Sequence, residues 1–218
     1  SAVHKNRSIH SFCMCPGGII APCATNSNEL VTNGWSPSRR DNKTANSGIV
    51  VQLNKKDFNT RKYKHFAALE FQKKIEKKAY QFSNQTQKIP AQKLSDFMND
   101  KLSVNIPKTS YIPGTISVKM SELFPRFIYE TLRFAFLDFD KKMSGYISNK
   151  AIVHAPESRT SSPIRIPRND ISLENDQIDG LFPCGEGAGY AGGIMSAAID
   201  GEKVAYMVNK KITMKELQ

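Results

Sequence analysis

The densest set of residues that could do chemistry lies near the end of the sequence, where glycine recurs through positions 185–193. A short strand over 181–184, a turn and a helix over about 192–210 are predicted here. The first N–H groups of such a helix suit an anion or a developing negative charge. The alternative is a tight turn whose glycines serve packing alone. Three of the glycines have the G-x-G-x-x-G spacing with which a backbone approaches a diphosphate: Gly187, Gly189 and Gly192.

This segment differs from the start of a dinucleotide-binding unit. Such a unit needs a second strand, with an acidic residue about 20 positions on that holds a ribose. We predict no strand after the last helix, so no βαβ unit can close there. Glu186 stands just before the turn and could bond ligand hydroxyls. The segment therefore predicts a cofactor-side turn at the end of a domain.

A second cluster, residues 157–165, combines cations with hydroxyl groups. Two guanidinium groups in one loop can clamp a carboxylate or a phosphate through paired hydrogen bonds. The alternative is a solvated loop in which an arginine pairs with Glu157. The candidate catalytic or substrate-binding side chains are Arg159, Thr160, Ser161 and Arg165, with Ser162 beside them.

The cysteines form a third candidate site. Cys13 and Cys15 have C-x-C spacing on a predicted strand, which would point both sulfurs to one face. Structural zinc sites usually have wider C-x2–4-C spacing, and no metal site is predicted. Buried thiols and a redox or substrate-facing pair remain the two interpretations. Four cysteines in 218 residues exclude a disulfide scaffold and indicate a reducing, cytoplasmic setting.

Other polar groups are weaker candidates. Arg39 and Arg40 could bind an anion, with a plain surface loop as the alternative. The four histidines have no metal-ligand spacing, and we interpret them as surface or satisfied core residues.

The strands and helices predicted to position these residues indicate an α+β fold. Its β structure would be mixed and mainly antiparallel, with strands at 9–15, 19–21, 29–32, 49–53 and 151–155. Helices are predicted at 65–82, 91–99 and 125–143, and a loop at 107–118. We divide the chain into a substrate-side domain, residues 1–178, and a terminal strand and helix, residues 179–218.

The net charge of +11 allows contact with anions or nucleic acid. The lysines concentrate on the polar side of the 65–82 helix, where a solvated face is the usual explanation. We find no membrane span and no signal peptide in the sequence. The chain begins without Met, as an excised fragment or a processed product would.

Several blocks together resemble a known family. They are Ser11–Gly18, Asn33-Gly34, Ala45–Ser47, Leu69–Gln72, Pro90–Gln92, Ser110–Gly114, Glu157–Ile166 and the tail through Asp200-Gly201. Taken together they are similar to the C-terminal portion of the uncharacterised FAD-dependent proteins often labelled NAD-utilising dehydrogenases. These belong to the flavoproteins with two dinucleotide-binding domains.

The resemblance implies an inserted substrate-side domain followed by the strand and helix that complete a Rossmann-like FAD domain. The N-terminal half that holds the FAD diphosphate would be the partner of this chain, and NAD(P)H a candidate electron donor. Catalytic roles would fall to Arg159, Thr160, Ser161, Arg165, Cys13 and Cys15. FAD would lie along Gly185, Glu186, Gly187, Gly189, Tyr190, Gly192, Gly193 and Ile194.

By this resemblance the chain is the C-terminal part of an FAD-dependent oxidoreductase with a small-molecule substrate. We expect it to be colourless and inactive alone. A basic module that binds RNA or another anionic partner is the alternative, and a purely structural interaction domain is the third hypothesis.

Overall fold

The computed structural model describes residues 1–216, which form two compact units. Unit 1 comprises residues 1–58 and 71–158. Unit 2 comprises residues 59–70 together with the chain from Arg159 onward. The predicted boundary between 178 and 179 lies inside unit 2, so that division stays a prediction.

The first half of unit 1 is antiparallel β structure. Strands β1 (Ala2–His4), β2 (Arg7–Cys15) and β5 (Asn46–Val51) form one sheet in the order β1-β2-β5. Ile9 on β2 pairs with Val51 and is fully buried. Strands β3 (Ile19–Pro22) and β4 (Thr32–Trp35) form a separate antiparallel pair.

A second sheet of unit 1 has β6 (Ile89–Lys93) between two neighbours. β7 (Thr115–Ser117) runs parallel to β6, and β8 (Ile152–His154) runs antiparallel to it. Residues 89–92 are all buried. The short helix α3 (Leu94–Met98) follows β6 directly. The mainly antiparallel α+β prediction is thus confirmed for this unit.

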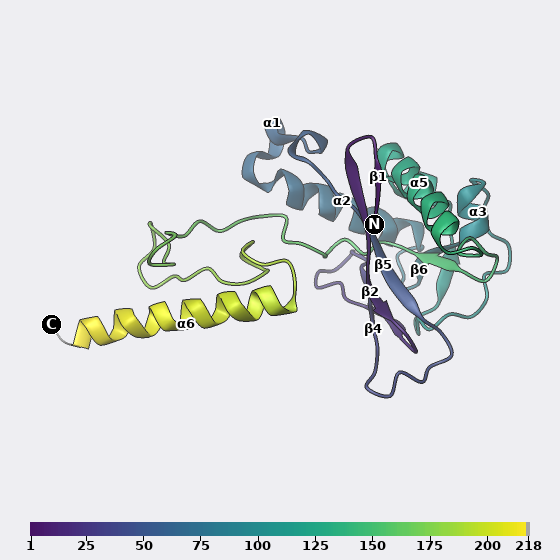
Figure 1. Ribbon diagram of the computed structural model, residues 1–218. Helices are drawn as coiled ribbons and strands as arrows, with labels where there is room; N and C mark the ends of the chain where they lie inside the picture. Colours follow the sequence, from purple (N-terminus) through teal and green to yellow (C-terminus); the bar gives the residue numbers. More distant parts are fainter. Residues whose placement is uncertain (217–218) are drawn as a thin grey trace. The chain divides into compact units, whose positions relative to one another are not determined.

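Helix α5 (Arg126–Lys142) supplies much of the core of unit 1. Pro125 is its N-cap residue and needs no N–H there, so it suits that end. The buried face of α5 packs Tyr129 and Phe136 against Phe97, with ring centroids 4.8 and 5.3 Å away. Phe97 is fully buried, which contributes on the order of 2 kcal/mol. Figure 1 shows α5 alongside β1, with which it is in contact.

Further short elements complete this part of the chain. They are the 3₁₀ turn η1 (Lys55–Asp57) and helix α4 (Met120–Leu123). The long helix α2 (Ala67–Phe82) crosses the division between the units.

Three predicted elements of unit 1 are wrong in extent or type. The strand at 29–32 is instead at 32–35, because Leu30 donates its N–H to the carbonyl of Glu76 rather than to a strand. Residues 91–93, predicted helical, belong to β6, where pairing on both sides outweighs helix propensity. The loop predicted at 107–118 contains β7.

Unit 2 is built on one long helix, α6 (Ile194–Glu216), preceded by an irregular segment that is hydrogen bonded to it. Helix α1 (Thr60–Tyr63) and the 3₁₀ turn η2 (Lys64–Phe66) belong to the same unit. The strand predicted at 181–184 is absent from the described chain, since the Pro183 carbonyl accepts from an arginine side chain instead.

None of the helices within residues 1–216 is both long enough and apolar enough to cross a membrane.

Candidate functional site

The glycine-rich turn of unit 2 closes through two backbone hydrogen bonds. Gly189 donates to the carbonyl of Glu186, and Tyr190 donates to the carbonyl of Gly185, each at 2.9 Å. Gly185 and Gly189 have φ of +69° and +85°, a region that favours glycine. The tight turn predicted from the sequence is therefore present, and two of its glycines are required by the backbone itself.

A buried ion pair anchors this turn to α6. The Arg168 guanidinium donates to both carboxylate oxygens of Asp200, at 3.0 and 2.6 Å, and to the Pro183 carbonyl at 2.7 Å. The Gly185 N–H donates to the Asp200 carboxylate at 2.8 Å. A single carboxylate on the helix thus holds both the backbone at the start of the turn and the arginine that braces it.

The electrostatics of this anchor follow from its hydrogen bonds. Donation from Arg168, together with the Gly185 N–H, lowers the pKa of Asp200 to about 2, against the opposing effect of burial. The pKa of Arg168 is raised, mainly by its bond to Asp200. Burial and the Asp200 charge raise the pKa of the Cys184 thiol. The pair is therefore fully ionised at neutral pH.

The loop 161–168 lies directly against the turn. The Ile166 N–H donates to the Ala188 carbonyl at 3.1 Å, and the Ser162 hydroxyl to the Gly187 carbonyl at 3.0 Å. The Tyr190 hydroxyl donates back to the Ile166 carbonyl at 3.0 Å. The structure thus brings together two clusters that the sequence analysis treated separately.

The glycines of the turn fall into two groups. A Cβ on Gly189 would lie 2.7 Å from the Ile164 carbonyl oxygen, so close packing excludes any side chain there. A Cβ on Gly187 or Gly192 would meet nothing within 4 Å, and one on Gly193 only the Ser196 hydroxyl at 4.0 Å. None of these three has a positive φ. Nothing in the described chain requires glycine at 187, 192 or 193.

The start of α6 differs from the prediction. The helix begins at Ile194 rather than at Gly192 and continues to Glu216, beyond the predicted end near 210. The Gly192 N–H donates to the Ser196 hydroxyl at 3.3 Å, so it is not open to a ligand. The N–H groups of the first three residues of α6, 194–196, have no hydrogen bond within the described chain, as is usual for a helix N-terminus.

The remaining predicted residues of unit 2 lie in different environments. Ser161 and Arg165 are exposed, while Arg159 and Glu186 are partly buried. The Thr160 hydroxyl oxygen is buried and has no hydrogen-bond partner among residues 1–216.

The two predicted cysteines lie in unit 1. β2 carries a register shift between Phe12 and Cys15, where it has one residue more than β5. Cys13 occupies this bulge at φ +48°, so the simple alternation that would place both sulfurs on one face does not apply. Burial, then Glu157 and Cys15, raises the pKa of Cys13. All four cysteines are free thiols.

Sequence reasoning missed Arg168 and Asp200. The signal available was an acidic residue beside the small residues Ala197 and Gly201 on the same helix. A carboxylate on the packed face of a helix needs a partner. The identity of that partner, 32 positions away, was not readable from spacing.

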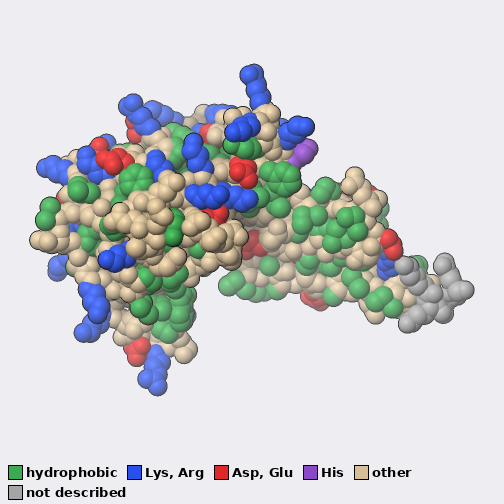
Figure 2. Space-filling view, turned by 180° about the vertical axis from the view of Figure 1, so that it is seen from behind, with side chains coloured by type: hydrophobic (Ala, Val, Ile, Leu, Met, Phe, Trp, Pro, Cys, Tyr) green, Lys and Arg blue, Asp and Glu red, His purple; other side chains and the backbone are tan. Residues whose placement is uncertain are grey.

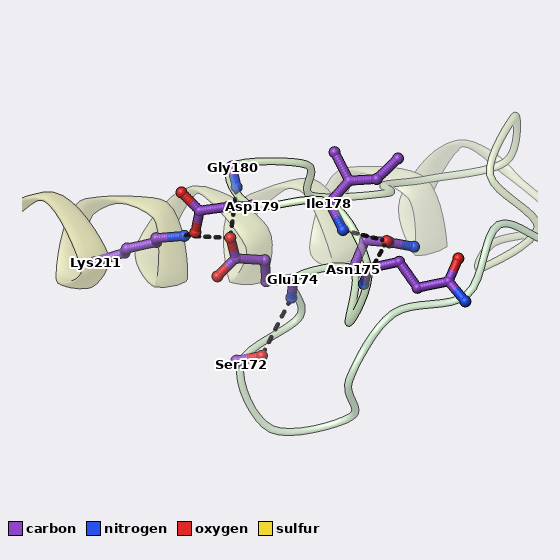
Figure 3. A network of polar contacts seen from close by, with 8 residues as sticks. Ser172, Glu174, Asn175, Ile178, Asp179, Gly180 and Lys211 are labelled. Atoms are coloured by element: carbon purple, nitrogen blue, oxygen red, sulfur yellow. Dashed lines mark hydrogen bonds and ion pairs between the residues drawn. The ribbon is translucent and has the colours of Figure 1, made fainter.

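The far end of α6 carries a second polar network (Figure 3). The Lys211 ammonium bonds both Glu174 and Asp179. Glu174 also accepts the Gly180 N–H at 2.6 Å, and Asn175 accepts the N–H groups of the loop that follows it. These bonds hold the 172–180 loop on the C-terminal part of α6.

No group of three or more His, Cys, Asp or Glu side chains within residues 1–216 is arranged to hold a metal ion.

Comparison with known proteins places the first 160 residues, which include the α+β unit, in a family. The family described as FAD-dependent protein, C-terminal domain-like, matches residues 1–160. The chain belongs to this family. It is also 40% identical over 210 residues to a protein of Clostridium beijerinckii (strain ATCC 51743 / NCIMB 8052) described as an uncharacterized protein.

That alignment covers 95% of this chain and 39% of the relative, so the chain spans about two fifths of the relative's length. The family match takes in unit 1 and ends at the beginning of the unit 2 segment that carries the turn. The chain is thus related to the C-terminal domain of FAD-dependent proteins.

Proposed function

We propose that this chain is the C-terminal part of an FAD-dependent oxidoreductase and that its glycine-rich turn lies against the cofactor. The observation that carries the proposal is the group of open glycines, 187, 192 and 193, where a Cβ would fill space that the described chain leaves empty. Glycine lets a backbone approach a ligand closely. Membership of an FAD-dependent family supports FAD as that ligand.

The residues present suit parts of this cofactor. Glu186 can accept hydrogen bonds from sugar or ribityl hydroxyls, and the N–H groups at Gly193 and Ile194 suit a site of negative charge. FAD, when bound, supplies hydride chemistry, with NAD(P)H as the proposed electron donor. The chain's own contribution is to shape the turn and to stabilise charge near it.

Candidate residues for the substrate side of the proposed enzyme occur in each of the two units. Arg159, Thr160, Ser161 and Arg165 would contact a small-molecule substrate. Cys13 and Cys15 remain candidates for a redox or substrate-facing role. The strained backbone at Cys13 supports a special role there, because such strain clusters at functional positions.

The proposed partner of α6 is the remaining FAD-binding half of a longer polypeptide. One side of the helix carries large apolar side chains in solvent: Met195 is 71% exposed, Ile199 49% and Tyr206 68%. Figure 2 shows hydrophobic side chains gathered on this part of the molecule. Apolar surface of this kind marks an interaction site. The relative's additional length provides a segment that could cover it.

The test uses absorption spectroscopy on a polypeptide extended toward the length of the relative. We expect a flavin spectrum that bleaches with NADH or NADPH, and no colour from residues 1–218 alone. Gly187→Ala should reduce flavin content at unchanged stability. The control is Gly180→Ala: its φ of +79° makes alanine costly, but flavin content should be unchanged. A colourless extended protein would overturn the proposal.

A second candidate, binding of an anionic polymer, is favoured by one observation. Phe66 is 59% exposed and follows exposed Lys64 and His65. An aromatic ring among cations is the combination with which single-stranded nucleic acid is bound. Salt-dependent gel shifts with single-stranded RNA that disappear in Phe66→Ala would support this candidate. No salt-dependent RNA binding by the parent chain would exclude this candidate, and unchanged binding in the variant would remove the role of Phe66.

A further inference from the structure

Tyr190 is the platform for two arginines that differ in one decisive respect. The Arg168 guanidinium lies 3.6 Å from the centre of its ring and the Arg165 guanidinium 4.3 Å. The ring itself is held by the bond from its hydroxyl to the Ile166 carbonyl. Both cations are therefore stacked on a fixed aromatic surface.

Arg168 is fully engaged within the fold. Its side chain is only 8% exposed, and it donates to both Asp200 oxygens and to the Pro183 carbonyl. Its charge is compensated by a carboxylate whose pKa is lowered to about 2. These three hydrogen bonds and the compensated charge give this arginine a structural role.

Arg165 has the same stacking but none of this engagement. It is exposed, and within residues 1–216 its guanidinium makes no hydrogen bond and no ion pair. Its backbone is nevertheless fixed. The next residue, Ile166, donates to the Ala188 carbonyl, and a Cβ on Gly189 would lie 3.1 Å from the Arg165 Cα. The guanidinium N–H donors of Arg165 are therefore free, while its backbone is fixed and one face of the guanidinium group is stacked on Tyr190.

The adjoining turn leaves further donors unused. The N–H groups of Gly187 and Ala188 have no hydrogen bond within the described chain, although the carbonyls of both residues accept from the 162–166 segment. A guanidinium fork matches the two oxygens of a carboxylate or a phosphate. Because Tyr190 restricts the side chain beforehand, less conformational entropy is lost on binding.

We propose that Arg165 is a binding residue for an oxyanion, the carboxylate or phosphate of a small ligand, that approaches the glycine-rich turn. Arg168 and Asp200 act as positioning residues, since they hold the turn and the ring on which Arg165 stacks. The inference goes beyond the proposed function because it concerns the anionic group recognised, and it holds whether or not that group belongs to FAD.

The test is an NMR titration of the ¹⁵N-labelled 218-residue chain with sodium pyrophosphate and, separately, with sodium succinate. The backbone amides of residues 187–189 and the Arg165 side-chain Nε–H report binding directly. We expect saturable shifts of these signals with one or both probes at concentrations up to about 10 mM. Pyrophosphate alone would identify a nucleotide phosphate as the source, and succinate a carboxylate.

The variant Arg165→Gln should weaken binding about tenfold or more, because a charge-assisted hydrogen-bonding group is lost. Arg165→Lys should recover part of the affinity, since it restores the charge but not the fork. Arg126→Gln removes an exposed arginine from unit 1 and is the matched control for net charge. The amide spectrum away from the substituted residue should be unchanged in each variant.

Two results would overturn the inference: no saturable shift with either probe, or equal affinity in Arg165→Gln and the parent chain. Its failure is distinguishable from that of the proposed function. A flavin spectrum of the extended polypeptide, together with equal oxyanion affinity in Arg165→Gln and the parent chain, would retain the cofactor and remove this site. Oxyanion binding by a protein that never binds flavin would retain the Arg165 site and remove the proposed cofactor.

Discussion

The glycines of the β structure in unit 1 and those of the turn in unit 2 look alike in the sequence but do opposite things. A Cβ on Gly17 would lie 2.1 Å from the Arg40 backbone, and one on Gly34 would lie 2.0 Å from the Asn46 side chain. Gly18 and Gly48 are similarly enclosed. In the turn of unit 2 only Gly189 meets such a neighbour.

This difference shows what a glycine-rich segment can mean. In unit 1 the space beside each of these four glycines is filled by the protein itself, so glycine serves packing. In unit 2 a Cβ on Gly187 or Gly192 would meet nothing within 4 Å in the described chain, and one on Gly193 would meet only the Ser196 hydroxyl, so packing does not account for these glycines. Charge follows a different division: unit 1 has 21 Lys and Arg against 11 Asp and Glu, whereas unit 2 has 10 against 9.

The largest expected effect is on the enclosed glycines. Gly17→Ala should destabilise unit 1 by about 3–4 kcal/mol, because a φ of +58° and a blocked Cβ position act together. Urea unfolding measures this change. Gly145→Ala is the matched control, since Gly145 has φ +86° but nothing within 4 Å, and should cost about 1 kcal/mol. Equal losses in the two variants would contradict the packing argument.

The next effect concerns the one enclosed glycine of the turn. Gly189→Ala should destabilise unit 2 by about 2–3 kcal/mol, because its Cβ would displace the Ile164 carbonyl and the backbone φ is +85°. The Gly185 N–H donates to the Asp200 carboxylate, so hydrogen exchange at this amide reports the loss of stability locally. Unaltered protection of that amide would show that the turn adapts and that Gly189 is not a packing glycine.

Acid should affect the two units in different pH windows. Burial lowers the pKa of His154 in unit 1 to about 4 from its usual 6.5. The unfolded chain therefore binds a proton first, and unit 1 loses on the order of 3 kcal/mol as pH falls through that interval. Asp200 in unit 2 has a pKa of about 2 against the usual 3.8, so its contribution is present above pH 4 and is lost between 4 and 2.

Hydrogen exchange across a pH series separates the two windows. His154→Gln should abolish the loss of stability between pH 6.5 and 4, and Asp200→Asn should abolish the loss between pH 4 and 2. If loss of protection in unit 1 between pH 6.5 and 4 were the same in His154→Gln, another group would be responsible.

The smallest effect on stability is expected at the open glycines. Gly187→Ala should change the free energy of unfolding by less than about 0.5 kcal/mol, because its Cβ would meet nothing and its φ is ordinary. Calorimetry of the 218-residue chain measures this. A loss comparable to that of Gly189→Ala would remove the distinction between the two groups of glycines.

Much of the local structure could be predicted, because it depends on periodicity along the chain. The apolar spacing of the helices at 65–82 and 125–143 predicted α2 and α5 within two residues at each end. The predictions failed at 91–93 and 181–184, where the partners of the backbone are distant in sequence. β6 is a strand because β7 and β8 flank it. The 181–184 segment is not a strand because its backbone bonds an adjoining loop and an arginine side chain instead of a neighbouring strand.

The candidate site divides in the same way. Residue types and spacing alone identified the glycine-rich turn and the arginine and hydroxyl cluster before it, because both are local in the chain. Only the tertiary structure showed that they touch, that Asp200 and Arg168 hold them, and that Arg165 keeps its donors free. The sequence alone determines where a glycine or an arginine stands in the chain. Whether its neighbours fill the space or satisfy the charge is decided only by what the folded chain brings within reach.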